Sequence, residues 1–160
     1  QEEAELFFWC LGLHLGRPGG QNPKGDLLGH VTDTNASKAD PMARLYQTSA
    51  NIDYHCDAAD VVGLLCLKKA KSGGKTFYHS DYFRSAVRHA EVAPFTEKEQ
   101  ALLDTYEQIA AEPGIFLDMD LQPGDIQLLS NHTNLHARTD YEDHEDPAER
   151  RHLLRLWLSL

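Results

Sequence analysis

The run Val61–Leu67 constrains the fold of this chain more than any other segment. It holds only apolar residues and one glycine, Asp60 precedes it, and Lys68 and Lys69 end it. A run of this length with polar residues on both sides is typical of a strand that is buried on both faces. The segment is therefore predicted to be such a strand, followed by a turn at Ser72–Lys75.

Short strands outnumber helices in the rest of the chain. Strand patterns occur at Leu27–Thr32, Leu45–Thr48, Thr76–His79, Ile115–Leu121, Ile126–Leu129, His136–Tyr141 and His152–Leu160. Helices are predicted at Ala4–His14, Asp81–His89 and Thr96–Ala111, the last of which begins with a capping-box pattern. The 160 residues are expected to form one domain, mainly β with helical additions, as a β-sandwich or jelly roll.

Charge and cysteine content narrow the function classes. The formal net charge is −10, which disfavours nucleic acid or an anionic membrane as a partner, because phosphate binding needs a basic surface. The three cysteines (Cys10, Cys56 and Cys66) cannot all pair within one chain and match no zinc or redox spacing. Reduced thiols, apolar runs too short to span a bilayer and the absence of a basic leader lead us to expect a cytoplasmic protein.

Two clusters of metal-ligand side chains lie far apart in the sequence. His55 and Asp57 are two residues apart, so an extended backbone points them to the same side. His132 and His136 follow much later. Two histidines and one carboxylate on one face of an octahedron are typical of non-haem Fe(II) enzymes. With nine histidines in the chain, surface or core histidines are the alternative interpretation of this pattern.

Two arginines interrupt the apolar strand pattern near the C-terminus. Arg151 and Arg155 share one strand face with Leu153 and Trp157. Burial of two guanidinium groups is costly without an anion, and a guanidinium pairs with a carboxylate through two parallel hydrogen bonds. A dicarboxylate ligand explains the pair, whereas pairing with the acidic loop Glu142–Glu149 or an exposed edge strand are the alternatives.

Taken together, these motifs and their order resemble the TauD/TfdA group of 2-oxoglutarate dioxygenases. The resemblance runs through Leu11–Asn22, Tyr46–Thr48, Asn51–Asp57, Val61–Thr76, Gly124–Gln127, Asn131–Arg138 and Arg151–Leu158. It implies a double-stranded β-helix, the jelly roll of that family, with Fe(II) in its open mouth. It further implies 2-oxoglutarate and O₂ as cosubstrates, and hydroxylation of a small molecule with release of succinate and CO₂.

The resemblance also assigns roles to the residues of the two metal-ligand clusters. It implies that His55, Asp57 and His136 bind the iron. His136 lies five residues after Asn131, at the position of the family's distal histidine, which makes His132 a neighbour and not a ligand.

By the same resemblance, four residues line the cosubstrate and substrate side of the iron. Thr76 and Arg151 match the threonine and arginine that bind the remote carboxylate of 2-oxoglutarate. Arg155 matches a second arginine of the pocket, and Asn51 matches a polar residue that faces the substrate. Arg155 and Asn51 suit an anionic or polar small molecule as the substrate.

The chain departs from the family pattern in length. Family members carry a sizeable segment between residues equivalent to Ser80 and Asp81, and more chain before residue 1. The whole chain is therefore expected to be a single TauD/TfdA-like domain, shortened near residues 80–81 and at the N-terminus. The alternatives are a non-catalytic relic on the same scaffold and a cupin-like enzyme that uses Zn²⁺ or Mn²⁺.

Overall fold

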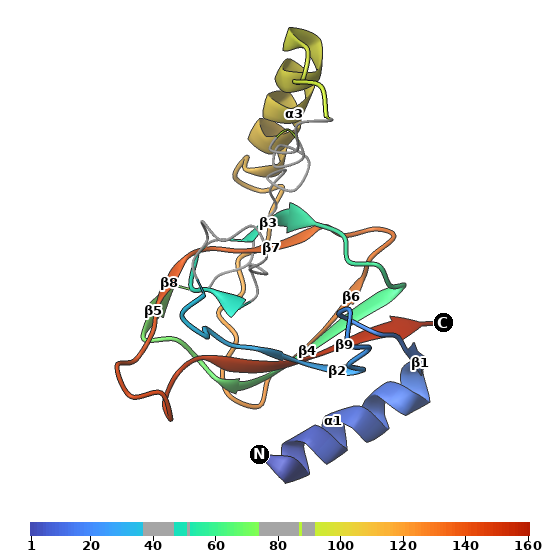
Figure 1. The fold of residues 1–160 in the computed structure, drawn as a ribbon, viewed down its shortest axis with the longest axis vertical. Coiled ribbons are helices and arrows are strands. Elements are labelled where there is room, and N and C mark those ends of the chain that lie inside the picture. Colours follow the sequence, from blue (N-terminus) through green and yellow to red (C-terminus); the bar gives the residue numbers. More distant parts are fainter. Residues whose placement is uncertain (37–46, 51, 74–86, 88–91) are drawn as a thin grey trace.

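The chain is mainly β, with two helices in the part that the structure describes (Figure 1). This computed structural model describes residues 1–36, 47–50, 52–73, 87 and 92–160. The helices are α1 (Glu2–Leu15) and α3 (Glu97–Ala110). The strands are β1 (Arg17–Pro18), β2 (Leu28–Val31), β3 (Ile52–His55), β4 (Val61–Lys68), β5 (Ser72–Gly73), β6 (Ile126–Ser130), β7 (His136–Arg138), β8 (Tyr141–Glu142) and β9 (His152–Ser159).

One antiparallel sheet forms the body of the molecule. Its strand order is β1-β9-β4-β6, and β2 also pairs with β9. Two short ladders, β3 with β7 and β5 with β8, lie beside this sheet (Figure 1). The predicted mainly β class is therefore confirmed. The predicted buried strand is β4, which lies between β9 and β6.

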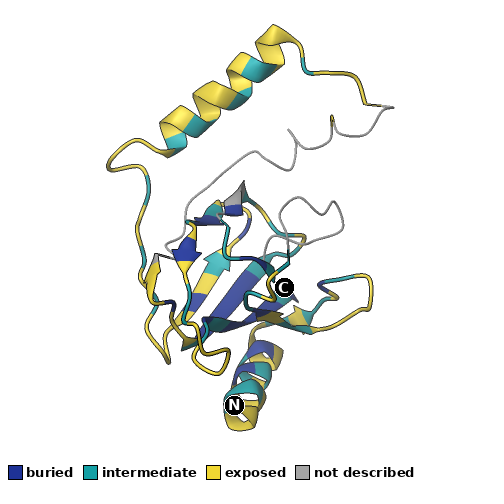
Figure 2. Cartoon of the chain, turned by 60° about the vertical axis from the view of Figure 1, so that its left-hand side comes forward, coloured by how far each residue is buried: buried dark blue, intermediate teal, exposed yellow. Residues whose placement is uncertain are grey.

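The two faces of β9 bury different sets of residues. Leu154, Leu156 and Leu158 pack with Phe8 of α1, so the helix covers this face of the sheet (Figure 2). Leu153 packs on the opposite face with a cluster that includes Leu64. Alternate residues of a strand point to opposite faces, so Arg151, Leu153, Arg155 and Trp157 share the second face, as the sequence predicts.

The face of β9 under α1 should dominate stability. Leu154 has no exposed surface. Leu154→Ala should lower the free energy of unfolding by about 2–5 kcal/mol, because it removes apolar contacts and leaves a cavity. Urea unfolding of the metal-free protein measures this change, and Leu160→Ala is the matched control because Leu160 is 80% exposed. Equal stability of the two variants would contradict this account of the core.

Most predicted elements that fall on described residues are observed. The helix ending near Ala111 begins at the predicted capping box, in which Thr96 and Glu99 each bond the other's backbone N–H. The predicted turn after β4 contains the short strand β5, which pairs with β8. The predicted strands at residues 45–48 and 76–79 and the helix at 81–89 fall largely or wholly outside the described residues.

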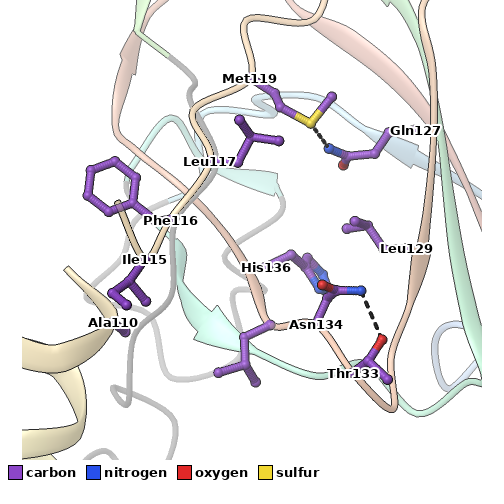
Figure 3. A pocket seen from close by; sticks show the side chains of 11 residues that line it. Ala110, Ile115, Phe116, Leu117, Met119, Gln127, Leu129, Thr133, Asn134 and His136 are labelled. Carbon is purple, nitrogen blue, oxygen red and sulfur yellow. Dashed lines mark hydrogen bonds between the residues drawn. The ribbon is translucent and has the colours of Figure 1, made fainter. Parts of the chain in front are cut away.

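The predicted strand at residues 115–121 is wrong. The segment has the alternating pattern, but no described strand pairs with it, and Ile115 and Leu117 are exposed. It instead follows α3, which lies apart from the sheet (Figure 1) and has no buried residue. The segment forms one wall of an open hollow (Figure 3). Phe116, Leu129 and His136 also line this hollow. None of the described helices is both long and apolar enough to span a bilayer.

Candidate metal centre

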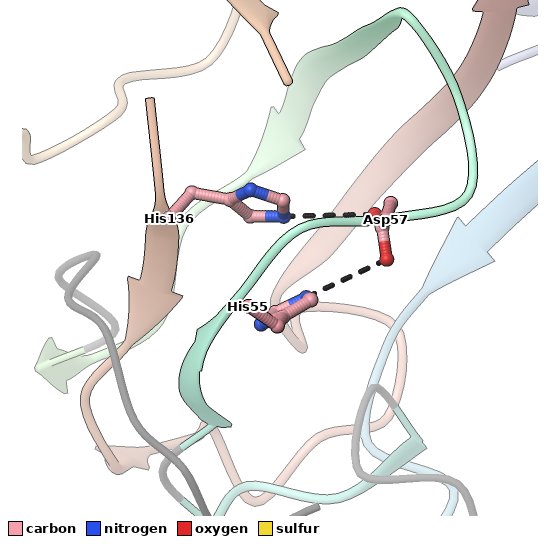
Figure 4. Close-up of side chains that lie close together, drawn as sticks. All are labelled: His55, Asp57 and His136. Carbon is pink, nitrogen blue, oxygen red and sulfur yellow. Dashed lines mark ion pairs between the residues drawn. The ribbon is translucent and has the colours of Figure 1, made fainter. Parts of the chain in front are cut away.

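The pairing of β3 with β7 brings the two ligand clusters of the sequence together. His55, the last residue of β3, lies opposite His136, the first residue of β7, and their ring centroids are 4.3 Å apart. Asp57 follows β3 by two residues and turns its carboxylate toward both rings (Figure 4). One ligand atom from each of the three residues lies within 4.8 Å of the other two.

The spacing of these donors fits a single metal ion. His55 Nε2 lies 3.6 Å from Asp57 Oδ1, and His136 Nε2 lies 3.5 Å from Asp57 Oδ2. Ligands about 2.1 Å from a metal and at right angles are about 3.0 Å apart, so these two distances are about half an ångström longer than those around a bound ion. Two imidazoles and a carboxylate suit an iron ion that keeps open positions.

The second histidine of the later cluster lies elsewhere. The side chain of His132 is 69% exposed, and its Nε2 lies 2.8 Å from Asp60 Oδ1. Among the described residues it therefore pairs with the half-buried carboxylate of Asp60, while His136 is the histidine that lies beside Asp57.

Asn131 anchors the backbone of Asp57, a role that the sequence reasoning missed. Its buried Nδ2 donates to the carbonyl oxygens of Asp57 at 2.5 Å and of Ala59 at 2.7 Å. In return, the backbone N–H of Asp57 donates to Asn131 Oδ1 at 3.3 Å. These bonds tie the turn that carries Asp57 to the segment that leads to His136. The Asn131-to-His136 spacing was the signal for this role.

The charges at the centre are those that metal ligands need. Burial and, next, the nearby charge of His136 lower the pKa of His55 from 6.5 to about 4. Burial raises the pKa of Asp57, but its hydrogen bond with His136 and the charge of Arg155 outweigh it, and the net pKa is lowered. A neutral imidazole and an ionised carboxylate are the protonation states that bind metal.

The lowered pKa of His55 predicts a pH dependence of stability for the metal-free protein. Between about pH 6.5 and pH 4 the unfolded chain takes up a proton on His55 that the folded protein resists. The free energy of unfolding therefore has its full value, as far as His55 is concerned, above pH 6.5. It decreases as the pH falls toward 4. Urea unfolding at several pH values, compared with His55→Gln, measures it. An identical pH profile in that variant would contradict the prediction.

Three arginines surround the centre. One cavity is lined by His55, Asp57 and His136 together with Arg138, Arg151 and Arg155. Arg151 is 7% exposed, its guanidinium carbon lies 5.1 Å from the ring centroid of Tyr141, and burial lowers its pKa. Its Nη1 has no hydrogen-bond partner among the described residues. A buried cation with an unused donor is the feature expected of an anion site.

Arg138 is a second buried cation at this place, and sequence reasoning missed it. Its guanidinium lies 4.8 Å from the Tyr141 ring centroid, on the ring that also neighbours Arg151. Burial and then the charge of Arg151 lower its pKa to about 10. Nη2 donates to the carbonyl oxygens of Thr48, at 2.8 Å, and Ala50. The signal was available, because Arg138 follows His136 by two residues and shares its strand face.

Arg155 has a different environment from Arg151. Its Nε donates to Gln21 Oε1 at 2.7 Å, and its Nη1 lies 3.8 Å from Asp57 Oδ2. Its guanidinium carbon is 4.9 Å from the ring centroid of Trp157. The alternative interpretation was pairing of these arginines with the acidic loop, and the backbone N–H of Arg151 does donate to Asp143 Oδ1 at 2.7 Å. Thr76, Asn51 and the join at residues 80–81 lie outside the described residues.

Comparison with protein families decides where this chain belongs. The model described as "Taurine catabolism dioxygenase TauD, TfdA family" matches residues 77–157, half of the chain. The chain belongs to the TauD/TfdA family. The matched range of this TauD/TfdA chain contains His136, Arg151 and Arg155, while His55 and Asp57 precede it.

Curated relatives of this TauD/TfdA chain come from a bacterium and a fungus. FR-33289 synthase of Streptomyces rubellomurinus is 28% identical over an alignment of 218 residues. This alignment covers 99% of this chain and 64% of the relative. The taurine hydroxylase-like protein SAT17 of Stachybotrys chartarum is 36% identical over 217 residues, covering 96% of this chain and 56% of the relative. The chain thus spans about three fifths of the length of these relatives.

Solved structures share the fold of the TauD/TfdA chain at low identity. Asparagine oxygenase superimposes with a TM-score of 0.67 and 18% identity, covering 92% of this chain and 61% of that structure. The non-haem iron oxygenase OrfP, solved with Fe, succinate and (3S)-hydroxy-L-Arg, gives a TM-score of 0.69 at 12% identity. That match covers 98% of this chain and 66% of OrfP.

Proposed function

We propose that this chain is an Fe(II)- and 2-oxoglutarate-dependent dioxygenase that hydroxylates a small molecule. The observation that carries the proposal is the meeting of His55, Asp57 and His136, with ligand atoms within 4.8 Å, in one cavity with Arg151. A metal triad alone would suit several metals and reactions. The adjacent buried arginine adds a binding group for a dicarboxylate, and that combination is what a 2-oxoglutarate enzyme needs.

In this proposal the chain's own residues hold the metal and orient the cosubstrate. His55, Asp57 and His136 are the iron ligands, and the carboxylate of Asp57 is their only negative charge. Arg151 pairs with the remote carboxylate of 2-oxoglutarate, with Thr76 as its second partner. When bound, Fe(II) supplies the oxidative chemistry, in which 2-oxoglutarate and O₂ are consumed, succinate and CO₂ are released, and the substrate gains a hydroxyl group.

Arg138 strengthens the case for a dianionic cosubstrate. It brings a second buried positive charge to the ring of Tyr141, beside Arg151. Two guanidinium groups repel each other in a medium of low polarity, and an anion between or beside them removes that cost. Arg138 Nε and Nη1 also have no partner among the described residues, so they are further donors for an anion.

The substrate is proposed to be a small polar molecule. Arg155 lines the metal cavity and also a second hollow, whose walls include Gln21, Asn22, Lys24 and Asp26. Both charge signs on its walls suit a polar or anionic compound, with Asn51 as a further contact. The architecture is proposed to be the family's double-stranded β-helix, as one domain of 160 residues that is shortened near residues 80–81.

One anaerobic experiment tests the proposal. Fe(II) is added to the metal-free protein, followed by 2-oxoglutarate, while the visible absorption is recorded. We expect stoichiometric iron binding and a new absorption that appears only with 2-oxoglutarate. Admission of O₂ should then give succinate, and a screen for compounds that raise succinate release identifies the substrate. Iron binding without any response to 2-oxoglutarate would favour a metal enzyme of another class, and no iron binding would favour a non-catalytic relic.

A further inference from the structure

The two carboxylate oxygens of Asp57 have different neighbours. Oδ1 lies 3.6 Å from His55 Nε2. Oδ2 accepts a hydrogen bond of 2.8 Å from the indole Nε1 of Trp157. His136 Nε2 and Arg155 Nη1 are farther from Oδ2, at 3.5 and 3.8 Å. Among the described residues, the indole N–H therefore makes the shortest of these contacts, and it is made to Oδ2.

Trp157 is held firmly enough to place that oxygen. It lies within β9 and pairs with Val62 of β4, so two strands fix its backbone. Its carbonyl oxygen also accepts from the N–H of Gly19 at 2.8 Å. Asp57 lies in the turn before β4, outside any strand, and needs an external group to fix its side chain. Because Trp157 is 100 residues away in the chain, the contact depends wholly on the tertiary fold.

Arg155 also lies beside this carboxylate, but its contact is longer than that of the indole N–H. The guanidinium lies over the indole ring at 4.9 Å, and its Nε is bound to Gln21 Oε1. An arginine that approached Asp57 directly would pair with both oxygens and neutralise the charge that a metal needs. A neutral indole N–H on Oδ2 orients the carboxylate and leaves its negative charge in place.

We infer that Trp157 is a positioning residue that holds Asp57 Oδ2 and so reserves Oδ1 for the metal. This inference rests on the proposed function, since it takes Asp57 as an iron ligand. Hydrogen-bond partners of metal ligands typically change metal affinity by about 10–100-fold when removed, because the ligand then loses its preset orientation. Trp157 would supply that orientation from β9, while Asn131 supplies it for the Asp57 backbone.

The test replaces a single N–H group. Trp9 and Trp157 are the only tryptophans of the chain, so Trp9→Phe leaves Trp157 as the sole site for a tryptophan analogue. Incorporation of 3-benzothienylalanine puts sulfur in place of the indole N–H and keeps the ring shape. Co²⁺ is the probe, and its dissociation constant and visible spectrum are measured by titration. We expect Co²⁺ affinity to fall about 10–100-fold and the visible bands to change, relative to Trp9→Phe with ordinary tryptophan.

Two further results make the outcome decisive. Trp157→Phe, which also lacks the donor, should weaken Co²⁺ binding to a similar extent, while Trp9→Phe alone should match the unaltered chain. Unchanged Co²⁺ affinity and spectrum in the benzothienyl protein would overturn the role of Trp157 and leave the proposed function intact. If the His136→Ala variant binds Co²⁺ as tightly as the unaltered chain, the proposed function itself fails, independently of Trp157.

Discussion

Asp57→Ala is expected to abolish Fe(II) binding and, with it, succinate formation. Asp57 is the only anion among the three proposed ligands, and its ionised form is favoured by a lowered pKa. The loss in affinity should exceed the roughly 10–100-fold typical of groups that only orient a ligand. Iron stoichiometry after equilibrium dialysis under anaerobic conditions measures it. Circular dichroism checks the fold, because the change also removes the partner of Trp157 and Arg155.

Two variants control this experiment. Asp57→Asn keeps the side-chain shape and an acceptor for Trp157 while removing the charge, so weak iron binding there isolates the effect of charge. His132→Ala removes an exposed imidazole that pairs with Asp60, and it should retain full iron stoichiometry. Wild-type iron content in Asp57→Ala would show that the carboxylate ligand comes from elsewhere in the chain.

Local patterns were enough to predict the two strands that hold most of the fully buried side chains. The apolar run of β4 and the alternation of β9 are both read from neighbouring residues, and both strands lie where they were predicted. The capping box before α3 is equally local, since Thr96 and Glu99 are three residues apart. The segment at residues 115–121 shows the limit of such patterns. Alternation predicts a strand only where a partner strand is available, and the sequence alone does not show that.

Part of the candidate site was also predictable from local residue spacing. His55 and Asp57 are joined by their spacing, but the choice of His136 over His132 came from family resemblance. In the structure that choice corresponds to the β3–β7 register, in which His55 lies opposite His136. The contact of Trp157 with Asp57 joins positions 100 residues apart, and no periodicity connects them.

The position of Arg138 was predictable only in part. It shares a strand face with His136, two residues away, and could have been placed near the metal by alternation alone. Its meeting with Arg151 could not, because no local pattern links the two arginines, which share Tyr141 as a neighbour. The consequence is that the cavity carries more positive charge than a sequence-based choice of Arg151 and Arg155 implies.

Arg151→Lys is expected to weaken 2-oxoglutarate binding about tenfold or more. The lysine keeps the positive charge but loses the planar fork that can bind both oxygens of a carboxylate. A hydrogen bond to a charged group is worth about 1.5–3 kcal/mol, and about 1.4 kcal/mol corresponds to a factor of ten. Calorimetric titration of the anaerobic Fe(II) protein with 2-oxoglutarate measures the dissociation constant.

The neighbouring arginine supplies the control for that measurement. Arg150→Lys should leave 2-oxoglutarate affinity unchanged, because Arg150 does not line the metal cavity and its Nη1 donates instead to Asn35 Oδ1 at 3.1 Å. Arg151→Gln removes the charge as well and should bind 2-oxoglutarate more weakly than Arg151→Lys. Since Arg138 remains beside the vacated position, some affinity should persist in both variants, and Arg138→Lys combined with Arg151→Lys should remove most of it. Unchanged affinity in Arg151→Gln would refute the assignment of Arg151 to the cosubstrate, while iron binding by His55, Asp57 and His136 would stand.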